Sequence, residues 1–239
     1  MKLTNLVYEP LQECHQRQAR KRLRQMEQLL PAPHTRLAIP FLFRGSGFFK
    51  HIRPMQSQAE IGELYRTVME HQPKTVVEIG TCHGGTLYLW CQAASPDATL
   101  VSIDLPEGEF GGGYKSCRTT FYQDFARSGQ TIHLLRGDSH SSQTMERVRE
   151  KLDNRPIDFL FIDGDHTYAG VKQDFELYSP LVAANGLIAL HDIHRRPEEP
   201  RIEVWRFWEE IRARNSAVTE WIDHSPGGRA IGIGLIRPA

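Results

Sequence analysis

Two segments of the sequence end an apolar run with side chains that can do acid–base or metal chemistry. "FLFIDGDHTY" places Asp163, Asp165 and His166 directly after four apolar residues, and "GLIALHDI" ends in the same way with His191 and Asp192. Neighbouring strands of a sheet lie about 4.8 Å apart, so two such strands would deliver these polar ends to one place. We therefore expect one site built from both segments.

The carboxylates of Asp163 and Asp192 can share one cation, with His191 or a water completing the coordination. Two carboxylates suit Mg²⁺ or Mn²⁺, whereas an added imidazole shifts the preference toward Mn²⁺, Fe²⁺ or Zn²⁺. Asp163, His191 and Asp192 are thus the predicted metal ligands.

Asp165 belongs to the same turn and is a candidate general base. His166 competes for that role, because the intrinsic pKa of an imidazole is nearer neutrality. The alternative is structural: Asp165 and Thr167 would cap the following helix. The sequence leaves this choice open.

A glycine-rich segment, "VVEIGTCHGGT" at 76–86, follows a buried strand and precedes a helix. Gly80 and Gly84 let the backbone turn tightly and approach a ligand closely. The spacing is neither Gly-x-Gly-x-x-Gly nor a phosphate loop ending in Gly-Lys-Ser/Thr, which disfavours a dinucleotide or ATP. Ordinary turn geometry is the alternative explanation.

Asp104 ends the second predicted strand, where a carboxylate can accept hydrogen bonds from both hydroxyls of a ribose. "RGDSH" follows the third strand, and Asp138 and Ser139 there can bond an adenine amino group, although Asp-Ser is also a common start of a helix. Together these segments favour an adenosine-type ligand.

The elements that must position these residues alternate along the chain. Strands are predicted at 74–80, 98–105, 131–137, 157–163, 185–193, 217–223 and 230–237, with a turn at Asn185 and Gly186. Helices are predicted at 11–30, 58–71, 116–129, 142–154, 167–184 and 204–211, with an irregular connector at 31–54. Such alternation specifies an α/β fold with a Rossmann-like, doubly wound, mostly parallel seven-stranded sheet and an antiparallel C-terminal hairpin. We expect an N-terminal helical extension at 1–54 and one domain at 55–239.

Composition narrows the class of protein. The chain has 239 residues, of which 40% are hydrophobic, and its 29 basic residues balance 29 acidic ones. Zero net charge argues against a nucleic-acid partner. Four cysteines without metal spacing, and no apolar stretch of membrane-spanning length, lead us to expect a cytoplasmic protein with no membrane partner. The N-terminal helix is a candidate element for homo-oligomer formation.

Taken together, these segments resemble the class I S-adenosylmethionine-dependent methyltransferases. "FIDGDHTYAGVKQDFELYSPLVAANGLIALHDI" is more narrowly similar to the divalent-metal-dependent sugar and small-molecule O-methyltransferases, the cephalosporin hydroxylase and rhamnosyl O-methyltransferase-like family. The resemblance implies a catalytic Asp165, assisted by His166, and the metal ligands named above. It implies cofactor contacts at Glu78, Gly80, Thr81, Gly84, Asp104, Asp138, Ser139 and Asp163.

The implied reaction is metal-assisted transfer of the methyl group of S-adenosylmethionine to a hydroxyl of a sugar or another vicinal diol. The acceptor pocket would use residues 41–56, the loop at 106–117 and residues 194–201, where Arg195, Arg196 and Arg201 can attract an anionic group. The loop from Phe110 to Tyr114 and the aromatic segment at 41–49 are predicted lids.

Two other functions remain open on the sequence. A non-haem iron oxygenase would use His166, His191 or His194 with an aspartate as a two-histidine, one-carboxylate site. A non-catalytic nucleotide-binding module would explain the glycines and Asp104, but it leaves the paired acidic and imidazole groups without a role.

Overall fold

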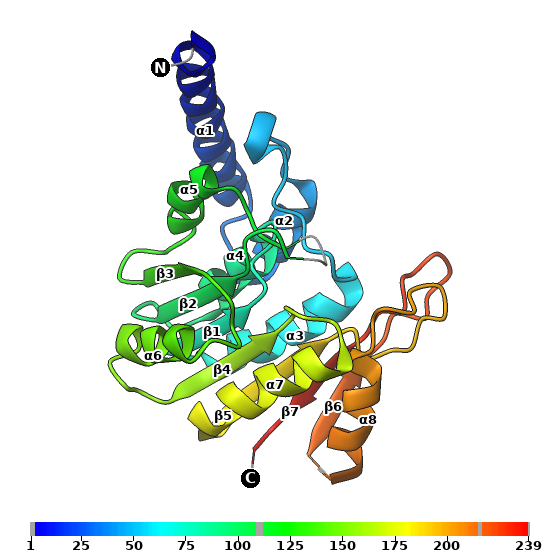
Figure 1. Ribbon diagram of the computed structural model, residues 1–239. Coiled ribbons are helices and arrows are strands. Elements are labelled where there is room, and N and C mark those ends of the chain that lie inside the picture. The colour runs from blue at the N-terminus through cyan, green and yellow to red at the C-terminus, as the bar shows by residue number, and fades with distance from the viewer. Residues whose placement is uncertain (1–2, 109–111, 215–216, 239) are drawn as a thin grey trace.

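The computed structural model describes residues 3–108, 112–214 and 217–238, and it contains a seven-stranded sheet (Figure 1). The strand order is β3-β2-β1-β4-β5-β7-β6. The first five strands pair in parallel, and β7 runs antiparallel to both β5 and β6. The predicted fold class is confirmed. The strands are β1 (Thr75–Ile79), β2 (Thr99–Asp104), β3 (Thr131–Arg136), β4 (Ile157–Ile162), β5 (Val182–His191), β6 (Val218–Trp221) and β7 (Ile233–Ile236).

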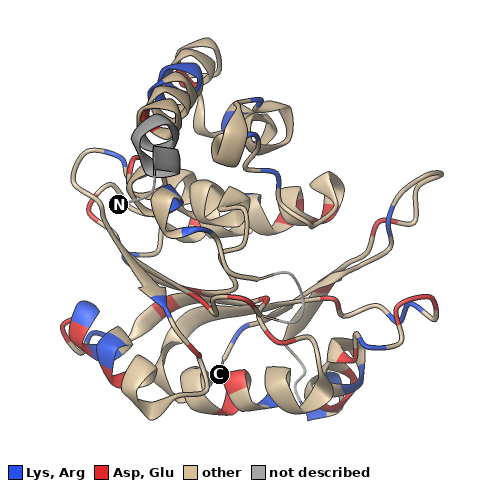
Figure 2. Cartoon of the chain, turned by 45° about the horizontal axis from the view of Figure 1, so that its top comes forward, with Lys and Arg blue, Asp and Glu red and all other residues tan. Residues whose placement is uncertain are grey.

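Helices cover both faces of the sheet (Figure 2). The helices α3 (Gln58–His71) and α4 (Gly85–Ala93) pack on one face, and α7 (Tyr168–Tyr178) and α8 (Val204–Arg214), with α6 (Ser142–Lys151), pack on the other. The central strands are apolar on both sides for this reason: Phe159 and Phe161 of β4 enter one core cluster, while Leu160 and Ile162 enter the other. No helix in the described part of the chain is both long and apolar enough to cross a lipid bilayer.

The N-terminal segment packs into the same core as the sheet. Its long helix α1 (Leu3–Leu29) buries Ala19, Leu23 and Met26 in the cluster that contains α4. The predicted connector contains η1 (Pro33–Ala38), α2 (Ile39–Leu42) and η2 (Gly47–Phe49). Phe43 and Phe49 are fully buried there, so the prediction of an aromatic lid at 41–49 is wrong. Burial of these rings outweighs any role at the surface, because each removes a large apolar area from water.

Two elements differ from their predicted extent. The predicted helix at 116–129 is only η3 (Ser116–Arg118) followed by α5 (Thr119–Gln123). The turn predicted at 185–186 lies inside β5, which begins after η4 (Ser179–Leu181) and shifts register against β4. A Cβ on Gly186 would lie 3.0 Å from the backbone oxygens of Ala183 and Ile157, so the glycine permits a close backbone approach in this irregular part of β5.

The connection between β6 and β7 is anchored by one buried carboxylate. Glu60 of α3 is 1% exposed, and its Oε1 accepts the backbone N–H groups of Asp223 at 2.8 Å, Ile231 at 3.2 Å and Gly232 at 3.0 Å. A single side chain therefore fixes both ends of a long surface loop, residues 222–232.

Replacing Glu60 with Ala should lower the free energy of unfolding by about 2–3 kcal/mol, because three buried N–H groups lose a charged acceptor. Urea unfolding monitored by circular dichroism measures this change. Glu63→Ala is the matched control, since Glu63 pairs with Arg66 on the exposed side of the same helix and should change stability by less than about 0.5 kcal/mol. Equal effects of the two substitutions would contradict the anchoring role.

Candidate active site

A cavity of about 540 Å³ opens at the carboxyl edge of the sheet, where the strand order reverses between β1 and β4. This edge is where doubly wound sheets bind ligands, and the volume suits a small molecule. Nine of the predicted catalytic, cofactor-binding and metal-binding residues line it. They are Gly80, Asp104, Asp138, Ser139, Asp163, Asp165, His166, His191 and Asp192.

The turn after β1 brings the backbones of β1 and β4 together at the floor of this cavity. Gly80 has a φ of +99°, and a Cβ at this position would lie 2.0 Å from the carbonyl oxygen of Asp163. Backbone hydrogen bonds of 2.8 Å hold the turn, one from Gly80 to Ile103 and one from Asp163 to Ile79. Only glycine fits this position without displacing the end of β4.

Three predicted cofactor residues, Glu78, Thr81 and Gly84, do not line the cavity but lie next to the turn after β1. Glu78 is fully buried, and its carboxylate accepts hydrogen bonds from Trp90 Nε1 at 3.0 Å and Ser102 Oγ at 2.6 Å. Burial raises the pKa of Glu78 to about 7. Thr81 Oγ1 lies 2.6 Å from the same Ser102 hydroxyl, and Gly84 precedes α4 with a φ of +78°. All three support the glycine turn, and their contact with a cofactor stays a prediction.

Asp104 connects the glycine turn to the loop after β2. Its Oδ2 accepts the N–H of Cys82 at 2.5 Å, and its Oδ1 accepts the N–H of Gly113 at 2.6 Å. Burial raises the pKa of the Asp104 carboxyl, while these two N–H groups act in the opposite direction. Tyr114 is only 4% exposed and packs on Tyr122, so this end of the predicted lid is fixed in the core. Phe110, the other end, lies outside the described residues.

His140 follows the Asp138–Ser139 pair in the cavity wall. The N–H of His140 donates to Asp138 Oδ1 at 2.9 Å, which is a capping geometry. Its Nε2 lies 3.3 Å from a carboxylate oxygen of Asp174, whose side chain is fully buried. The hydrogen bond to Asp174 raises the pKa of His140 to about 8, although burial acts against it.

The raised pKa of His140 makes stability depend on pH in a defined direction. A folded-state pKa above the ordinary 6.5 adds stability below pH 6.5, and this contribution disappears as the pH rises through about 8. His140→Asn should therefore destabilise the protein by ~1 kcal/mol more at pH 6 than at pH 9, after allowance for solvent screening. Urea unfolding at both pH values measures the difference, with His34→Asn on the surface as control. A larger cost at pH 9 would contradict the assignment.

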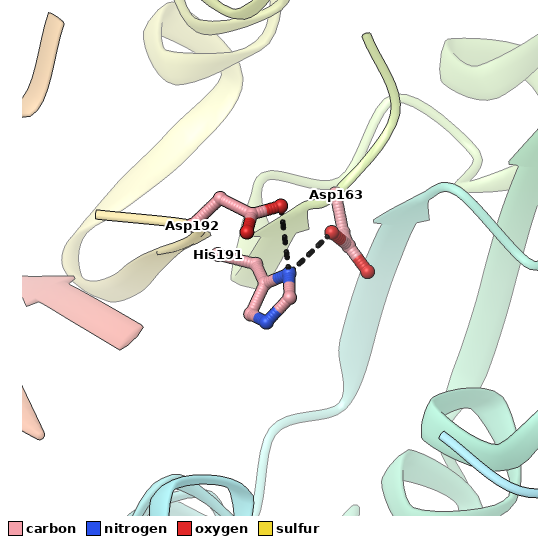
Figure 3. Close-up of side chains that lie close together, drawn as sticks. All are labelled: Asp163, His191 and Asp192. Atoms are coloured by element: carbon pink, nitrogen blue, oxygen red, sulfur yellow. Dashed lines mark hydrogen bonds and ion pairs between the residues drawn. The ribbon is translucent and has the colours of Figure 1, made fainter. Parts of the chain in front are cut away.

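Asp163, His191 and Asp192 meet at the cavity, as the sequence predicted (Figure 3). His191 Nδ1 lies 2.8 Å from Asp163 Oδ1 and 3.3 Å from Asp192 Oδ2. One ligand atom from each residue lies within 4.8 Å of the others. Asp192 has a φ of +60°, a strained conformation for an aspartate, which such sites often contain.

The outer oxygen of each carboxylate is held by a neighbouring donor. Gln56 Nε2 donates to Asp163 Oδ2 at 2.7 Å, and the Arg196 guanidinium donates to Asp192 Oδ1. The inner oxygens therefore both face His191. Burial alone would lower the pKa of His191, but the charges of Asp192 and Asp163 raise it to about 10. Burial would raise the pKa of Asp192, yet His191 and His166 hold it well below its usual range.

The two predicted base residues differ in what they contact. Asp165 Oδ1 accepts the N–H of Thr167 at 2.8 Å, and its Oδ2 lies beside Gly170 at the start of α7. Thr167 Oγ1 in turn accepts the N–H of Gly170. Asp165 and Thr167 therefore cap the start of α7, as the structural alternative predicted. His166 Nδ1 lies 2.9 Å from Asp192 Oδ2, which ties this imidazole to the cluster.

The remaining predicted residues are divided between the cavity and its surroundings. Arg201 lines the cavity, whereas Arg195 lies over the Trp205 ring at 5.0 Å and His194 lies beside His224. The cluster of described residues thus offers one imidazole with two carboxylates, not the two-histidine set of an iron oxygenase. Arg229 also lines the cavity, and no motif in the sequence marks it.

Comparisons with known proteins agree with this geometry. The sequence model of a family described as a methyltransferase domain matches residues 77–193. The O-methyltransferase TomG of Streptomyces achromogenes, solved with S-adenosylmethionine, is 18% identical, with a TM-score of 0.53 over 74% of this chain and 78% of that one. An O-methyltransferase of Bacillus cereus, solved with S-adenosylhomocysteine, is 19% identical, with a TM-score of 0.55 over 72% and 77%.

Two curated relatives are uncharacterized. One, from Sinorhizobium fredii, is 25% identical over 171 residues, and the other, from Acanthamoeba polyphaga mimivirus, is 33% identical over 142 residues. These matches cover 69% and 59% of this chain but only 18% and 61% of the relatives' own length. The family match and the solved structures lead to one conclusion: residues 77–193 are similar to a methyltransferase domain, and the chain has the fold of these O-methyltransferases.

Proposed function

We propose that this protein is an S-adenosylmethionine-dependent O-methyltransferase that uses a divalent cation and acts on a hydroxyl of a sugar or another vicinal diol. The observation that carries the proposal is one cavity with two chemically different parts. Asp104 and Asp138 line it together with Gly80, and the cluster of Asp163, His191 and Asp192 lines it as well. A methyl donor and a chelated acceptor can therefore occupy it together.

The cofactor fits the part of the cavity around the glycine turn. Gly80 of this turn lines the cavity, and Asp104 offers carboxylate oxygens to ribose hydroxyls beside it. Asp138 and Ser139 lie after β3, where an adenine ring would contact them. S-adenosylmethionine supplies a methyl group already activated by the sulfonium charge, so the protein contributes mainly position and exclusion of water.

The donor set of the cluster fits a divalent cation. Asp163 Oδ1, His191 Nδ1 and Asp192 Oδ2 face one another, while Gln56 and Arg196 hold the outer carboxylate oxygens, as supporting partners of metal ligands do. One imidazole with two carboxylates favours Mn²⁺, Fe²⁺ or Zn²⁺ over Mg²⁺. A bound cation would lower the pKa of a coordinated hydroxyl and so supply the nucleophile.

Within this proposal, His166 is better placed than Asp165 to take the proton of the acceptor hydroxyl. Asp165 Oδ1 accepts the backbone N–H of Thr167, and its Oδ2 lies beside Gly170 at the start of α7. Asp192 contacts His166 Nδ1 and holds the ring at the cavity wall, where this imidazole can take the proton. Asp192 thus both belongs to the cluster and orients the base.

Calorimetric titration of S-adenosylhomocysteine, followed by methyl transfer to a panel of vicinal-diol sugars, tests the proposal. We expect a Kd on the order of micromolar with and without a chelator, about tenfold weaker binding by Asp104→Asn, and turnover only with added Mn²⁺ or Mg²⁺. Absence of S-adenosylhomocysteine binding would refute the whole proposal. Full turnover after chelation would refute the role of the metal but not the proposed methyl transfer.

A further inference from the structure

A second cavity, of about 550 Å³, adjoins the first one. Met55 and Arg229 line both cavities, so the two spaces meet at these side chains. The second cavity is built by two segments that are far apart in the sequence. One is residues 44–58 of the N-terminal region, and the other is the loop 222–232 that Glu60 anchors between β6 and β7.

The lining of this cavity is strongly basic, although the chain as a whole has no net charge. Four cationic side chains line it, with Asp223 as the one acidic residue. The Asp223 carboxylate is already engaged, because it accepts hydrogen bonds from Ser57 Oγ at 2.7 Å and from the backbone and hydroxyl of Ser225. The four cations are Arg44, Lys50, Arg53 and Arg229.

Most of this positive charge has no partner in the described part of the chain. Among the described residues, no hydrogen bond or ion pair engages the side chain of Lys50 or Arg229, and Arg53 lies over the Phe41 ring at 5.8 Å. Arg44 alone is committed, because its Nη1 donates to backbone carbonyls. Cationic side chains that converge on a cavity without acidic partners indicate an anionic ligand.

Neutral hydrogen-bonding groups complete the cavity wall. The rings of His51 and His83 lie 4.3 Å apart, and Arg118 donates to the backbone carbonyls of both residues. Burial lowers the pKa of both histidines, that of His83 to about 4, so neither adds charge at neutral pH. His51 Nδ1 is buried and has no hydrogen-bond partner among the described residues. A ligand with oxygen atoms could satisfy it.

Gln56 connects the basic cavity to the cluster of Asp163, His191 and Asp192. This side chain is 4% exposed and lines the second cavity, while its Nε2 donates to Asp163 Oδ2 at 2.7 Å. Its Oε1 is buried without a partner in the described chain, so it can accept a hydrogen bond from a ligand hydroxyl. Gln56 thus lies between the basic cavity and the Asp163 carboxylate, which would face the methyl acceptor.

We propose that the methyl acceptor carries a phosphate or diphosphate group, which the basic cavity binds while a hydroxyl of the same molecule reaches Asp163. This inference rests on the proposed function and specifies its acceptor as a phosphorylated compound, for instance a sugar phosphate. Several cationic side chains around one cavity match the several oxygens of a phosphate group. A carboxylate ligand would need only one guanidinium group. The two adjoining cavities together provide space for the phosphate group and for the hydroxyl that is methylated.

Calorimetric titration of inorganic pyrophosphate, in buffer freed of metals with a chelating resin, tests the inference without knowledge of the acceptor. The full-length protein should bind pyrophosphate, and the double variant Lys50→Gln/Arg229→Gln should bind it at least about tenfold more weakly, as the loss of two charge-assisted contacts predicts. Arg195→Gln is the matched control, because Arg195 lies over Trp205 and lines neither cavity. It should change pyrophosphate affinity by less than about twofold.

The outcomes separate this inference from the proposed function. Pyrophosphate binding lost only in the double variant, with S-adenosylhomocysteine still bound by every variant, supports the inference. No pyrophosphate binding by a protein that binds S-adenosylhomocysteine overturns the inference alone. Equal loss in the Arg195→Gln control overturns the cavity as the binding site. Succinate binding as tight as pyrophosphate overturns the assignment of a phosphate group.

Discussion

Asp163→Asn should weaken Mn²⁺ binding by roughly 10²-fold while S-adenosylhomocysteine affinity changes by less than about threefold. The amide keeps the size of the side chain and the hydrogen-bonding capacity toward Gln56, but it removes the charge of the oxygen that faces His191. A divalent cation depends on that charge far more than a neutral hydroxyl contact does. Manganese binding followed by electron paramagnetic resonance measures the effect, and no methyl acceptor is needed.

Asp165→Asn is the matched control for this substitution, because it changes a carboxylate two residues away in the same turn. Its oxygens face the start of α7 instead of His191, so Mn²⁺ affinity should stay within about threefold of the unaltered protein. Similar losses in the two variants would mean that the general charge of the turn, and not Asp163 itself, attracts the cation. An unchanged affinity in Asp163→Asn would refute the metal site.

Gly80→Ala should lower the free energy of unfolding by about 3 kcal/mol and abolish measurable binding of S-adenosylhomocysteine. The new Cβ would lie 2.0 Å from the backbone oxygen of Asp163, and the φ of +99° is strained for any residue with a side chain. Because the obstructing atom belongs to the backbone, the end of β4 itself must move. Urea unfolding and calorimetry measure the two effects on the same preparation.

Gly108→Ala offers the matched comparison, since Gly108 lines the same cavity but has room for a side chain. The nearest atom to its added Cβ, the carbonyl oxygen of Leu105, lies at an ordinary contact distance of 3.5 Å. We expect a change in stability of less than about 0.5 kcal/mol. If Gly80→Ala were equally mild, the close approach of β1 and β4 would not shape the site.

Local sequence patterns were enough to predict the sheet and the residues at the strand ends. Buried strands and amphipathic helices leave local hydrophobic patterns, so the alternation along the chain predicted all seven strands. Asp163 and Asp192 could be paired in advance because each directly follows or ends a parallel strand, and adjacent strands bring their carboxyl ends to one edge. Such predictions need only local patterns and one general rule of packing.

Local patterns failed where a long-range contact decided the outcome. The aromatic residues Phe43 and Phe49 resemble a lid in sequence, but the surface that buries them belongs to the core cluster built on α4. Asn185 and Gly186 resemble a turn, yet they lie within β5, in the stretch between Val182 and Leu187 where the register against β4 shifts. Propensity is a weak preference, and tertiary packing overrides it when enough surface becomes buried.

Only the tertiary structure revealed which side chains support the cluster and which form the basic cavity. Gln56 is 107 residues from Asp163 in the chain, and no periodicity records that its amide holds the outer oxygen of that carboxylate. Lys50 and Arg229 share a cavity because α3, through Glu60, fixes the loop that carries Arg229. The sequence specifies these contacts only through the complete path of the chain, since closing such long loops costs entropy that the whole fold repays.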